Sequence, residues 1–383
     1  MKPLKIAFVS LSDAGNVRHW SGTTFHMAQA LAAQPGVTLV RIDDLEQRCR
    51  GMSWRIQWLR KAFYRLAGQQ FDLKREPSWL KSVGARIREE LPADTDIVFA
   101  DSSLPLAFLD TKLPMAFLTD ACFDGMLDFY FPRATLPAPT LRHGQAVEQR
   151  ALDRCGHAFY ASDWAAGTAA KAYGVPAHKL HVVPLGANLA TSPTRAQVAA
   201  SIAARPTDRI ELLLCGVEWE RKGGDFAVDV VRELNAAGTP ARLHVCGIRQ
   251  LPAGLPDFVV DHGFLNKGIP EEARRFDQLF EQSHLLLVPT RAEAFGLVFC
   301  EASAFGLPSV TTDVGGIPTV VREGENGKTF PLTAPAAEYA AWITALMADR
   351  AAYDDLAMRS FETYERRLNW TIAARDILAT LRG

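Results

Sequence analysis

The sequence lacks the features that mark several common protein classes. Its six cysteines are scattered, with no C-x-x-C pair and no histidine spacing that would complete a metal cage. No apolar run approaches the roughly 18 residues of a membrane span, and the opening segment "MKPLKIAFVSLSDAG" has too short an apolar core for a signal peptide. We therefore expect buried free thiols, no bound metal and a cytoplasmic protein.

Two nucleotide-binding motifs are also missing. No G-x-G-x-x-G occurs, which argues against a dinucleotide-dependent dehydrogenase. The segment "GENGKT" at 324–329 has the ending of a phosphate-binding P-loop, but Arg322 stands where that motif requires glycine. The structure expected around this segment, a turn followed by a strand, also differs from that of a P-loop.

The length and charge of the chain are typical of an ordinary globular protein. The chain has 383 residues, enough for two domains that each bury a core. It is 48% hydrophobic and 22% charged, with a formal net charge of -1. A dedicated nucleic-acid-binding protein usually carries a basic excess, so we do not expect a nucleic-acid partner.

Short apolar runs alternate with helical patterns along the chain. This alternation is typical of α/β domains in which helices cover both faces of a parallel sheet. In the first half, strands are predicted at Ile6–Ser10, Val37–Ile42, Ile97–Ala100, Met115–Leu118, His157–Ala161 and Leu180–Val183. In the second half, they are predicted at 210–216, 241–247, 284–289 and 308–312. We infer two doubly wound domains that enclose a cleft, with ligand sites at the carboxyl ends of their strands.

A polar stretch rich in alanine, proline and threonine interrupts this alternation at 186–208 and is interpreted as the connection between the domains. We place one Rossmann-like domain at 1–186 and a second at 187–362. The remaining segment, 363–383, is predicted to be an amphipathic helix that packs across the domain junction.

The stretch "EAFGLVFCEASAFGLP" places two carboxylates on either side of a glycine-containing turn. Residues Leu297 to Phe305 are predicted to form a helix that Gly306 caps at its C-terminus. Glu301 then lies on the helix, whereas Glu293 lies in the loop before it. The two carboxylates are therefore expected to reach one cleft from separate positions.

A second motif, "CGVEWERKGGDFAVDVV", begins at Cys215. Arg221 and Lys222 lead through two glycines directly into a helix, so two cations meet the positive end of a helix dipole, as a phosphate site requires. Taken alone, the stretch also fits a solvated pair on a surface helix. A nucleoside-diphosphate sugar would use both motifs, because cations neutralise the pyrophosphate while carboxylates accept hydrogen bonds from sugar hydroxyls.

With these motifs the chain resembles the retaining glycosyltransferases of family 4, which have the GT-B fold. The resemblance is most specific at the E-x7-E pair of Glu293 and Glu301, at "SAFGLPSVTTDVGGIPTVV" and "NGKTFPL", and at Lys222 with Gly223. The segments "YGVPAHKLHVVPLGA" and "HGFLNK" agree with it, as does Trp370. It implies two Rossmann-like domains facing each other across a cleft, the first binding an acceptor and the second a nucleotide sugar.

The resemblance also implies roles for individual residues. Glu293 would hold hydroxyls of the transferred sugar, Glu301 the ribose and Lys222 the diphosphate. Many members carry an arginine after the glycine that ends the preceding strand, where this chain has Val217; Arg221 is the candidate replacement. The donor-binding residues so implied are Gly22, Gly216, Arg221, Lys222, Glu293, Ala294, Phe295, Gly296, Leu297 and Glu301. The candidate catalytic residues are Glu293 and Lys222, which the resemblance implies, and Arg221 and Asp120, which stand where the chain departs from the family pattern.

The N-terminal half gives weaker signals. Gly22 follows the first strand, where a glycine-rich loop of the family faces the diphosphate and the acceptor; a plain flexible turn with a Ser21 or Thr23 cap is the alternative. Asp120 follows a later strand, where many members place a histidine. It either binds sugar or acceptor hydroxyls or caps the next turn, and the sequence leaves both open.

Residues 47–68 carry six cations and no carboxylate. An apolar row recurs there at helical spacing, formed by Ile56, Leu59, Phe63 and Leu66. One interpretation is a helix whose basic side meets an anionic membrane or an acidic acceptor. The interpretation that we favour is a core-facing helix with a solvated basic edge. Residues 48–66 thus leave open a peripheral contact at the inner membrane face.

The predicted function is metal-independent transfer of a sugar, with retention, from a nucleoside-diphosphate sugar to an acceptor hydroxyl in glycan, glycolipid or glycoconjugate biosynthesis. The donor is a co-substrate, and no other cofactor is expected. An epimerase or hydrolase acting on nucleotide sugars with the same fold is the rival enzyme, and a non-catalytic nucleotide-sugar sensor is the rival binding protein.

Overall fold

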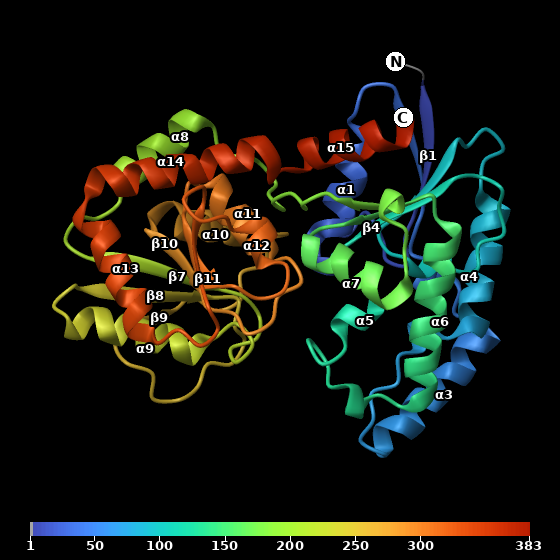
Figure 1. The fold of residues 1–383 in the computed structure, drawn as a ribbon, viewed down its shortest axis with the longest axis horizontal. Coiled ribbons are helices and arrows are strands. Elements are labelled where there is room, and N and C mark those ends of the chain that lie inside the picture. The colour runs from blue at the N-terminus through green and yellow to red at the C-terminus, as the bar shows by residue number, and fades with distance from the viewer. Residues whose placement is uncertain (1–2) are drawn as a thin grey trace. The chain divides into compact units, whose positions relative to one another are not determined.

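A computed structural model describes residues 3–383. The chain divides into two compact units. The N-terminal unit consists of the chain up to Pro184 together with Ala373–Gly383, and the C-terminal unit is Leu185–Ile372. Each unit contains one six-stranded sheet in which all neighbouring strands are parallel (Figure 1).

In the N-terminal unit the strand order is β2-β1-β3-β4-β5-β6. The strands are β1 (Leu4–Val9), β2 (Val37–Ile42), β3 (Ile97–Ala100), β4 (Met115–Thr119), β5 (His157–Tyr160) and β6 (Leu180–Val182). The helices are α1 (Thr23–Ala32), α2 (Leu45–Arg48), α3 (Met52–Leu66), α4 (Pro77–Glu90), α5 (Phe123–Met126), α6 (Ala138–Arg154) and α7 (Asp163–Tyr173). Helices α4, α6 and α7 share one hydrophobic cluster with alternate residues of the central strands, so they cover the same face of the sheet.

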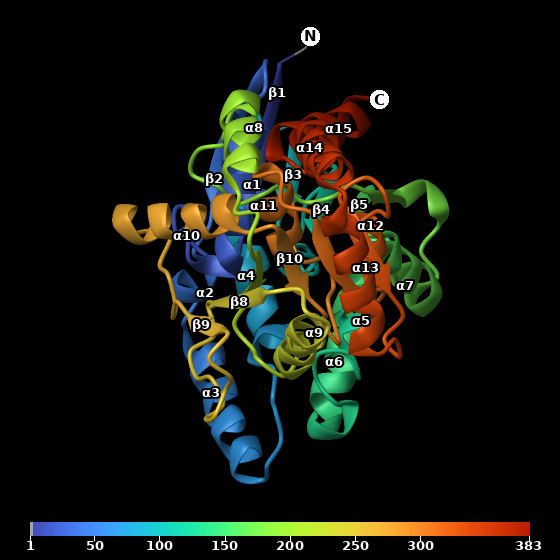
Figure 2. The ribbon, with the colours of Figure 1, turned by 90° about the vertical axis from the view of Figure 1, so that its left-hand side faces the viewer.

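In the C-terminal unit the order is β12-β11-β10-β7-β8-β9. The strands are β7 (Ile210–Cys215), β8 (Ala241–Cys246), β9 (Val259–Asp261), β10 (Leu285–Val288), β11 (Ser309–Thr312) and β12 (Gly327–Phe330). The helices are α8 (Arg195–Ala204), α9 (Gly224–Ala236), α10 (Pro270–Gln282), α11 (Leu297–Ala304), α12 (Ile317–Val320), α13 (Ala336–Ala348) and α14 (Arg350–Arg367). The last helix, α15 (Trp370–Arg382), begins in this unit and belongs to the N-terminal unit from Ala373 onward. Helix α9 packs with α13 on one face, and α8 packs with α10 and α14 on the other (Figure 1, Figure 2).

The strand orders locate the places where a doubly wound sheet binds its ligands. In each sheet the order reverses beside the first strand, between β1 and β3 in the N-terminal unit and between β7 and β10 in the C-terminal unit. The loops leaving these neighbouring strands diverge to opposite faces and open a crevice at their carboxyl ends. The loops after β7 and β10 contain both predicted site motifs.

The sequence prediction of two doubly wound α/β domains is confirmed, and the ten predicted strands each overlap an observed one. Two elements differ from expectation. The predicted connection at 186–208 contains helix α8, whose first turn is fixed by a capping box between Thr194 and Gln197. The final segment is not one helix: α14 ends at Arg367, and the side chain of Asn369 accepts a hydrogen bond from the backbone N–H of Ile372 in the first turn of α15.

The favoured interpretation of residues 47–68 is wrong. Helix α3 forms as predicted, but its apolar row faces outward: Leu59 is 65% exposed and Leu66 is 91% exposed. The helix packs instead through a mixed row on another side, in which the ring of Trp54 lies against Trp79 and that of Tyr64 stacks on Phe71. Periodicity located the apolar row but not the side that meets the protein.

The structure also describes the cysteines and the lengths of the helices. All six cysteines are free thiols, and five of them are buried. Across residues 3–383, every helix is too short or too polar to cross a membrane.

Candidate functional site

Two loops meet at the carboxyl ends of β7 and β10, where the order of the C-terminal sheet reverses. The backbone N–H of Arg291 donates to the carbonyl of Arg221 across 2.8 Å, and the hydroxyl of Thr290 donates to the same oxygen across 3.0 Å. Gly223 makes this approach feasible. Its φ is +73°, and a Cβ at this position would lie 2.1 Å from the carbonyl oxygen of Pro289.

The ammonium group of Lys222 donates a hydrogen bond to Oε2 of Glu293. Both residues are buried, each with 7% of its surface exposed. The stem of Lys222 crosses Gly216, where a Cβ would lie 2.8 Å from Cγ of the lysine. Burial in a medium of low polarity penalises each charge, and the attraction between the ammonium and carboxylate groups offsets this cost. The structure thus brings together three residues that the sequence predicted for the donor site.

Arg221 adds a second cation to this carboxylate. Its guanidinium donates to Oε2 of Glu293 across 3.4 Å and to the carbonyl of Ala292 across 3.1 Å. It also donates to Glu218 across 3.0 Å. Arg221 and Lys222 therefore reach Glu293 together, from the turn that leads into α9. Val217, where the family often has arginine, is 56% exposed.

The loop from Ala294 to Leu297 leads from Glu293 into α11. Ala294 and Phe295 are each 1% exposed, and Gly296 is the N-terminal cap residue with a φ of +89°. The first backbone N–H groups of a helix have no partner within it and give its N-terminus a partial positive charge. The N-terminus of α11 therefore adds electrostatic attraction for an anion beside Lys222.

Glu301 forms a second buried centre on α11. Its Oε1 accepts a hydrogen bond from Nζ of Lys267 across 2.5 Å, and Nζ also donates to the carbonyl of Asn188 across 3.1 Å. The side chain of Asn188 accepts a hydrogen bond from the indole of Trp370 across 2.8 Å. Glu301 is 5% exposed, so Lys267 is the cation that neutralises it within the unit.

The two centres border the same strand ends. Cys215 and Cys246 are register partners at the ends of β7 and β8, and Cys215 directly precedes Gly216. The hydrogen bond between the two thiols raises the pKa of Cys215 and lowers the pKa of Cys246. Glu301 and Lys267 are close enough to act electrostatically on both thiols. The two predicted glutamates thus lie at one edge of the sheet, each with its own lysine.

Gly22 and Asp120 lie in the N-terminal unit. Gly22 is the N-terminal cap residue of α1, and it follows Trp20 and Ser21, so that three successive residues have positive φ. Such conformations are costly for residues other than glycine, and they cluster at functional sites. Asp120 follows β4 and is half-buried. The roles of both residues stay predictions.

A carboxylate that the sequence did not single out supports this loop. Asp101 follows β3 and accepts hydrogen bonds from the hydroxyls of Ser10 and Thr24, each across 2.7 Å. Burial raises the pKa of Asp101, while the two hydroxyls favour its ionised form. These groups lie where the N-terminal sheet reverses its order, so Asp101 ties the end of β1 to the start of α1.

The sequence analysis also did not identify Lys267 and Asn188 as site residues. Lys267 stands in "HGFLNK" and lies 34 positions from Glu301, and nothing in the local pattern announces this long-range pair. The segment follows β9 and so lies at the same sheet edge as both motifs, but β9 was not among the predicted strands. By contrast, the position of Asp101 directly after a buried strand was a usable signal.

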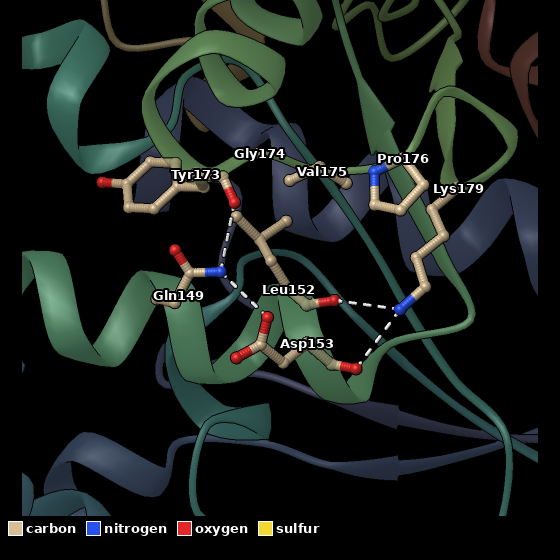
Figure 3. Close-up of a pocket in the computed structure, with 8 residues that line it drawn as sticks. All are labelled: Gln149, Leu152, Asp153, Tyr173, Gly174, Val175, Pro176 and Lys179. Atoms are coloured by element: carbon tan, nitrogen blue, oxygen red, sulfur yellow. Dashed lines mark hydrogen bonds between the residues drawn. The ribbon is translucent and has the colours of Figure 1, made fainter.

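A cavity of about 300 Å³ lies elsewhere, in the N-terminal unit (Figure 3). Its polar groups bond to one another: Gln149 donates to Asp153 and to the carbonyl of Tyr173, and Lys179 donates to the carbonyls of Leu152 and Asp153 (Figure 3). A second cavity, of about 410 Å³, is lined by residues that include Pro206. Neither contains a predicted site residue, so we assign the site from the converging charges at the strand ends.

Comparison with known proteins places this geometry in a family. Residues 209–349 match the family model described as glycosyl transferases group 1. This segment, somewhat over a third of the chain, is similar to the group 1 glycosyltransferases. This finding confirms the resemblance to family 4 that the sequence motifs indicated.

One curated relative supports the same similarity. The chain is 32% identical over 230 residues to a D-inositol 3-phosphate glycosyltransferase of Xylanimonas cellulosilytica, an alignment that covers 54% of this chain and 52% of the relative. The chain thus spans about half the length of the curated relative that it matches.

Solved structures show the GT-B fold along nearly the whole chain. A sucrose-phosphate synthase from Thermosynechococcus elongatus has a TM-score of 0.68 at 17% identity, with 99% of this chain and 98% of that chain covered. Anabaena HepE in complex with UDP has a TM-score of 0.63 at 18% identity, with 99% and 100% covered. At these identities the likeness is one of fold.

The segment that matches the family model contains the residues that converge at the candidate site. Gly216, Lys222, Lys267, Glu293 and Glu301 all lie within residues 209–349. Gly22 and Asp120 lie outside it.

Proposed function

We propose that the protein is a retaining glycosyltransferase that moves a hexosyl group from a nucleoside-diphosphate sugar to an acceptor hydroxyl. The observation that carries this proposal is the buried pair of Lys222 and Glu293, with Arg221 beside it, between the starts of α9 and α11. One relative is named a D-inositol 3-phosphate glycosyltransferase, and Anabaena HepE was solved both with UDP and with UDP and glucose. These names support a nucleotide-sugar donor.

The charges of the site suit the transition state of such a transfer. Negative charge builds on the departing diphosphate as the bond from the anomeric carbon to the phosphate oxygen breaks. Lys222, Arg221 and the N-terminus of α11 supply fixed positive charge there, and interactions that strengthen with this charge lower the barrier. The ammonium group that pairs with Glu293 can share its remaining N–H donors with a phosphate. The mechanism that we propose draws on these groups and needs no further cofactor.

The two glutamates would hold the two ends of the donor. A carboxylate is an acceptor that suits vicinal hydroxyl groups, so Glu293 would orient the sugar and Glu301 the ribose. In the same-face displacement, the bond from the acceptor oxygen to the anomeric carbon forms on the side that the phosphate leaves. The acceptor proton passes to the departing phosphate oxygen. Glu293 then orients the sugar, while a double displacement with Glu293 as nucleophile is the competing route.

The donor is the part of this proposal that binding can test first. Melting of the protein with UDP, GDP and ADP, and then with their sugars, should give one nucleotide that stabilises it. A ligand at about 100 times its dissociation constant adds about 2.7 kcal/mol. Lys222→Ala should lose most of that stabilisation. If none of the nucleotides or their sugars raises the melting temperature, the proposal fails.

Turnover separates the proposed reaction from its rivals. The donor that binds is incubated with and without a panel of hydroxyl acceptors, and the products are identified by mass spectrometry and NMR. Transfer with an unchanged anomeric configuration supports the proposal. Rapid epimerisation or hydrolysis without an acceptor favours an epimerase or hydrolase, and tight binding without any turnover favours a sensor.

The place of action is a separate prediction. The sequence predicted a cytoplasmic protein and left open peripheral contact with an anionic membrane through residues 48–66. We keep the cytoplasm as the proposed location, and the acceptor as an unidentified hydroxyl compound.

A further inference from the structure

Helix α3 presents a row of large apolar side chains to the outside of the N-terminal unit. The row is spaced four and three residues apart along the helix. The exposed fractions are 71% for Met52, 49% for Ile56, 65% for Leu59, 67% for Phe63 and 91% for Leu66. At about 100° per residue these five side chains fall within a sector of about 80°, so they form one continuous apolar stripe along the helix.

The exposure of this stripe is fixed by the way α3 packs. The amide of Gln57 donates to the hydroxyl of Ser78 across 3.1 Å, and the guanidinium of Arg60 donates to Glu76 across 2.7 Å. Glu76 is 2% exposed, so its carboxylate is withdrawn from water, whereas Arg60 is half-buried. A helix that turns a mixed row toward the protein and a row of large apolar side chains outward is the reverse of an ordinary surface helix. Such an exposed apolar stripe is typical of an interaction surface.

The charge around the stripe limits what that partner can be. Residues 47–71 contain six cations and no carboxylate. Three of the cations have carboxylate partners, and the other three, on α3, have none among residues 3–383. The paired cations are Arg48, Arg50 and Arg60, and the unpaired ones are Arg55, Lys61 and Arg65. At about 100° per residue, Arg55 flanks the stripe, whereas Lys61 and Arg65 lie on the opposite side of the helix. An apolar stripe on a helix whose unpaired charges are all positive fits a surface that offers negative charge above hydrocarbon.

We infer that α3 is an interfacial helix that docks the protein on an anionic lipid bilayer. The apolar stripe would enter the boundary between headgroups and acyl chains with Arg55 at the level of the lipid phosphates, while Lys61 and Arg65, on the far side of the helix, add longer-range attraction to the anionic surface. Trp58, which is 58% exposed, lies one turn from Arg55 and has the amphipathic ring that suits this boundary. The inference does not depend on the proposed transferase activity, because it rests on α3 alone.

A second copy of the chain is the alternative occupant, because the spacing of the stripe also matches a coiled-coil seam. In a parallel pair of such helices, Arg55 of one copy would face Arg60 of the other across the seam. Arg60 is already paired with Glu76, but Arg55 would meet no acid of the partner helix, because α3 contains none. The charge pattern therefore favours the bilayer.

The first test compares binding of the protein to vesicles of phosphatidylcholine alone and of phosphatidylcholine mixed with phosphatidylglycerol, by flotation. The wild type should bind the mixed vesicles and be released by high salt. Leu59→Glu with Phe63→Glu should lower the partition coefficient about 100-fold or more, because two inserted side chains become charged. The matched control is Phe264→Glu with Leu332→Glu, which changes the same residue types at positions that are 51% and 56% exposed. It should bind like the wild type.

A second set of variants tests the charges. Arg55→Gln, Lys61→Gln and Arg65→Gln together should lower binding about 100-fold at low salt. The matched control, Lys112→Gln, Arg142→Gln and Lys171→Gln, removes three exposed cations from the same unit and should lower it far less. Thermal melts should show all four variants folded, because the changed side chains are exposed.

Three outcomes would overturn the inference. The wild type could fail to bind the mixed vesicles, or each α3 variant could bind as well as its matched control. Light scattering could instead show a wild-type dimer that Leu59→Glu with Phe63→Glu dissociates, which would assign the stripe to a second copy. Loss of binding without loss of turnover on a soluble acceptor would leave the proposed activity standing.

Discussion

Two buried glutamates, Glu211 on β7 and Glu293 in the loop after the neighbouring β10, lie near opposite ends of β7 and have different surroundings. Near the start of the strand, Glu211 accepts hydrogen bonds from Arg209 across 2.7 Å and interacts with His244 across 2.9 Å. Beyond the other end, Glu293 accepts hydrogen bonds from Lys222 and Arg221. Each glutamate is 7% exposed and has two basic partners.

The two glutamates differ in the elements to which their basic partners belong. His244 lies within β8 and bonds onward to His262 across 2.8 Å, and the backbone N–H of Glu211 donates to His284 across 2.9 Å. These groups are tied to strands and to one another. Lys222 and Arg221 instead stand in a loop that opens a helix, and Glu293 stands in another. Only the carboxyl end of the sheet therefore offers helix N-termini that attract an anion, so the comparison predicts function at one end and stability at the other.

The largest expected effect is a loss of activity from substitutions at the carboxyl end of the sheet but not at the other end. Glu293→Gln removes the charge that orients the sugar, and Lys222→Ala removes a cation that stabilises the leaving diphosphate. Each should lower kcat about 100-fold to 1,000-fold, as loss of one fixed electrostatic group does in other enzymes. The measurement is steady-state transfer from the donor that the binding screen identifies.

The matched control for activity is Glu211→Gln, which changes the same residue type at the other end of the strand. Below its melting temperature this variant should turn over at a rate within about twofold of the wild type, since the expected change in barrier is under about 0.4 kcal/mol. Equal losses of activity at Glu211 and Glu293 would remove the distinction between the ends.

The second expected effect is on stability and concerns Glu211. Although burial opposes ionisation, hydrogen bonds from His244 and Arg209 lower the pKa of Glu211 to about 2 from its ordinary 4.5. A carboxyl whose pKa is lower in the folded state stabilises the fold above the unfolded pKa and loses this contribution as pH falls. The full shift corresponds to about 3 kcal/mol, which solvent screening should reduce to about 1–2 kcal/mol.

Denaturant titrations of the wild type and Glu211→Gln should therefore differ most at neutral pH. The difference in unfolding free energy should shrink between about pH 4.5 and pH 2, the window set by the two pKa values. A difference that does not change with pH would mean that the Glu211→Gln variant loses packing rather than charge interactions. Glu293→Gln is the comparison variant, and its lost function should not be explained by unfolding at neutral pH.

The sequence predicted one of these ends much better than the other. The strands were found because buried parallel strands are continuous apolar runs, and Lys222 and Glu293 were found because each follows such a run in a distinctive local pattern. The network around Glu211 has no local pattern: His284 is 73 positions away and meets it only through the sheet. The same limit hid Lys267, and it misdirected α3, because periodicity shows an apolar row without showing which side meets the protein.

The smallest expected effect concerns Val217, which stands where family members often carry arginine. It tests whether Arg221 supplies the missing positive charge at the carboxyl end of the sheet. Arg221 is partly exposed and shared between Glu218 and Glu293, so Arg221→Gln should lower kcat/KM only about fivefold, or about 1 kcal/mol. Adding Val217→Arg should restore part of this loss, because it places a cation directly after Gly216, where family members often carry one. The contrasting double variant combines Arg221→Gln with Lys222→Arg. It should not restore kcat/KM, because the bulkier guanidinium would crowd Gly216. If Arg221→Gln has no effect on steady-state kinetics, Lys222 alone neutralises the diphosphate, and Arg221 serves to hold the two loops together.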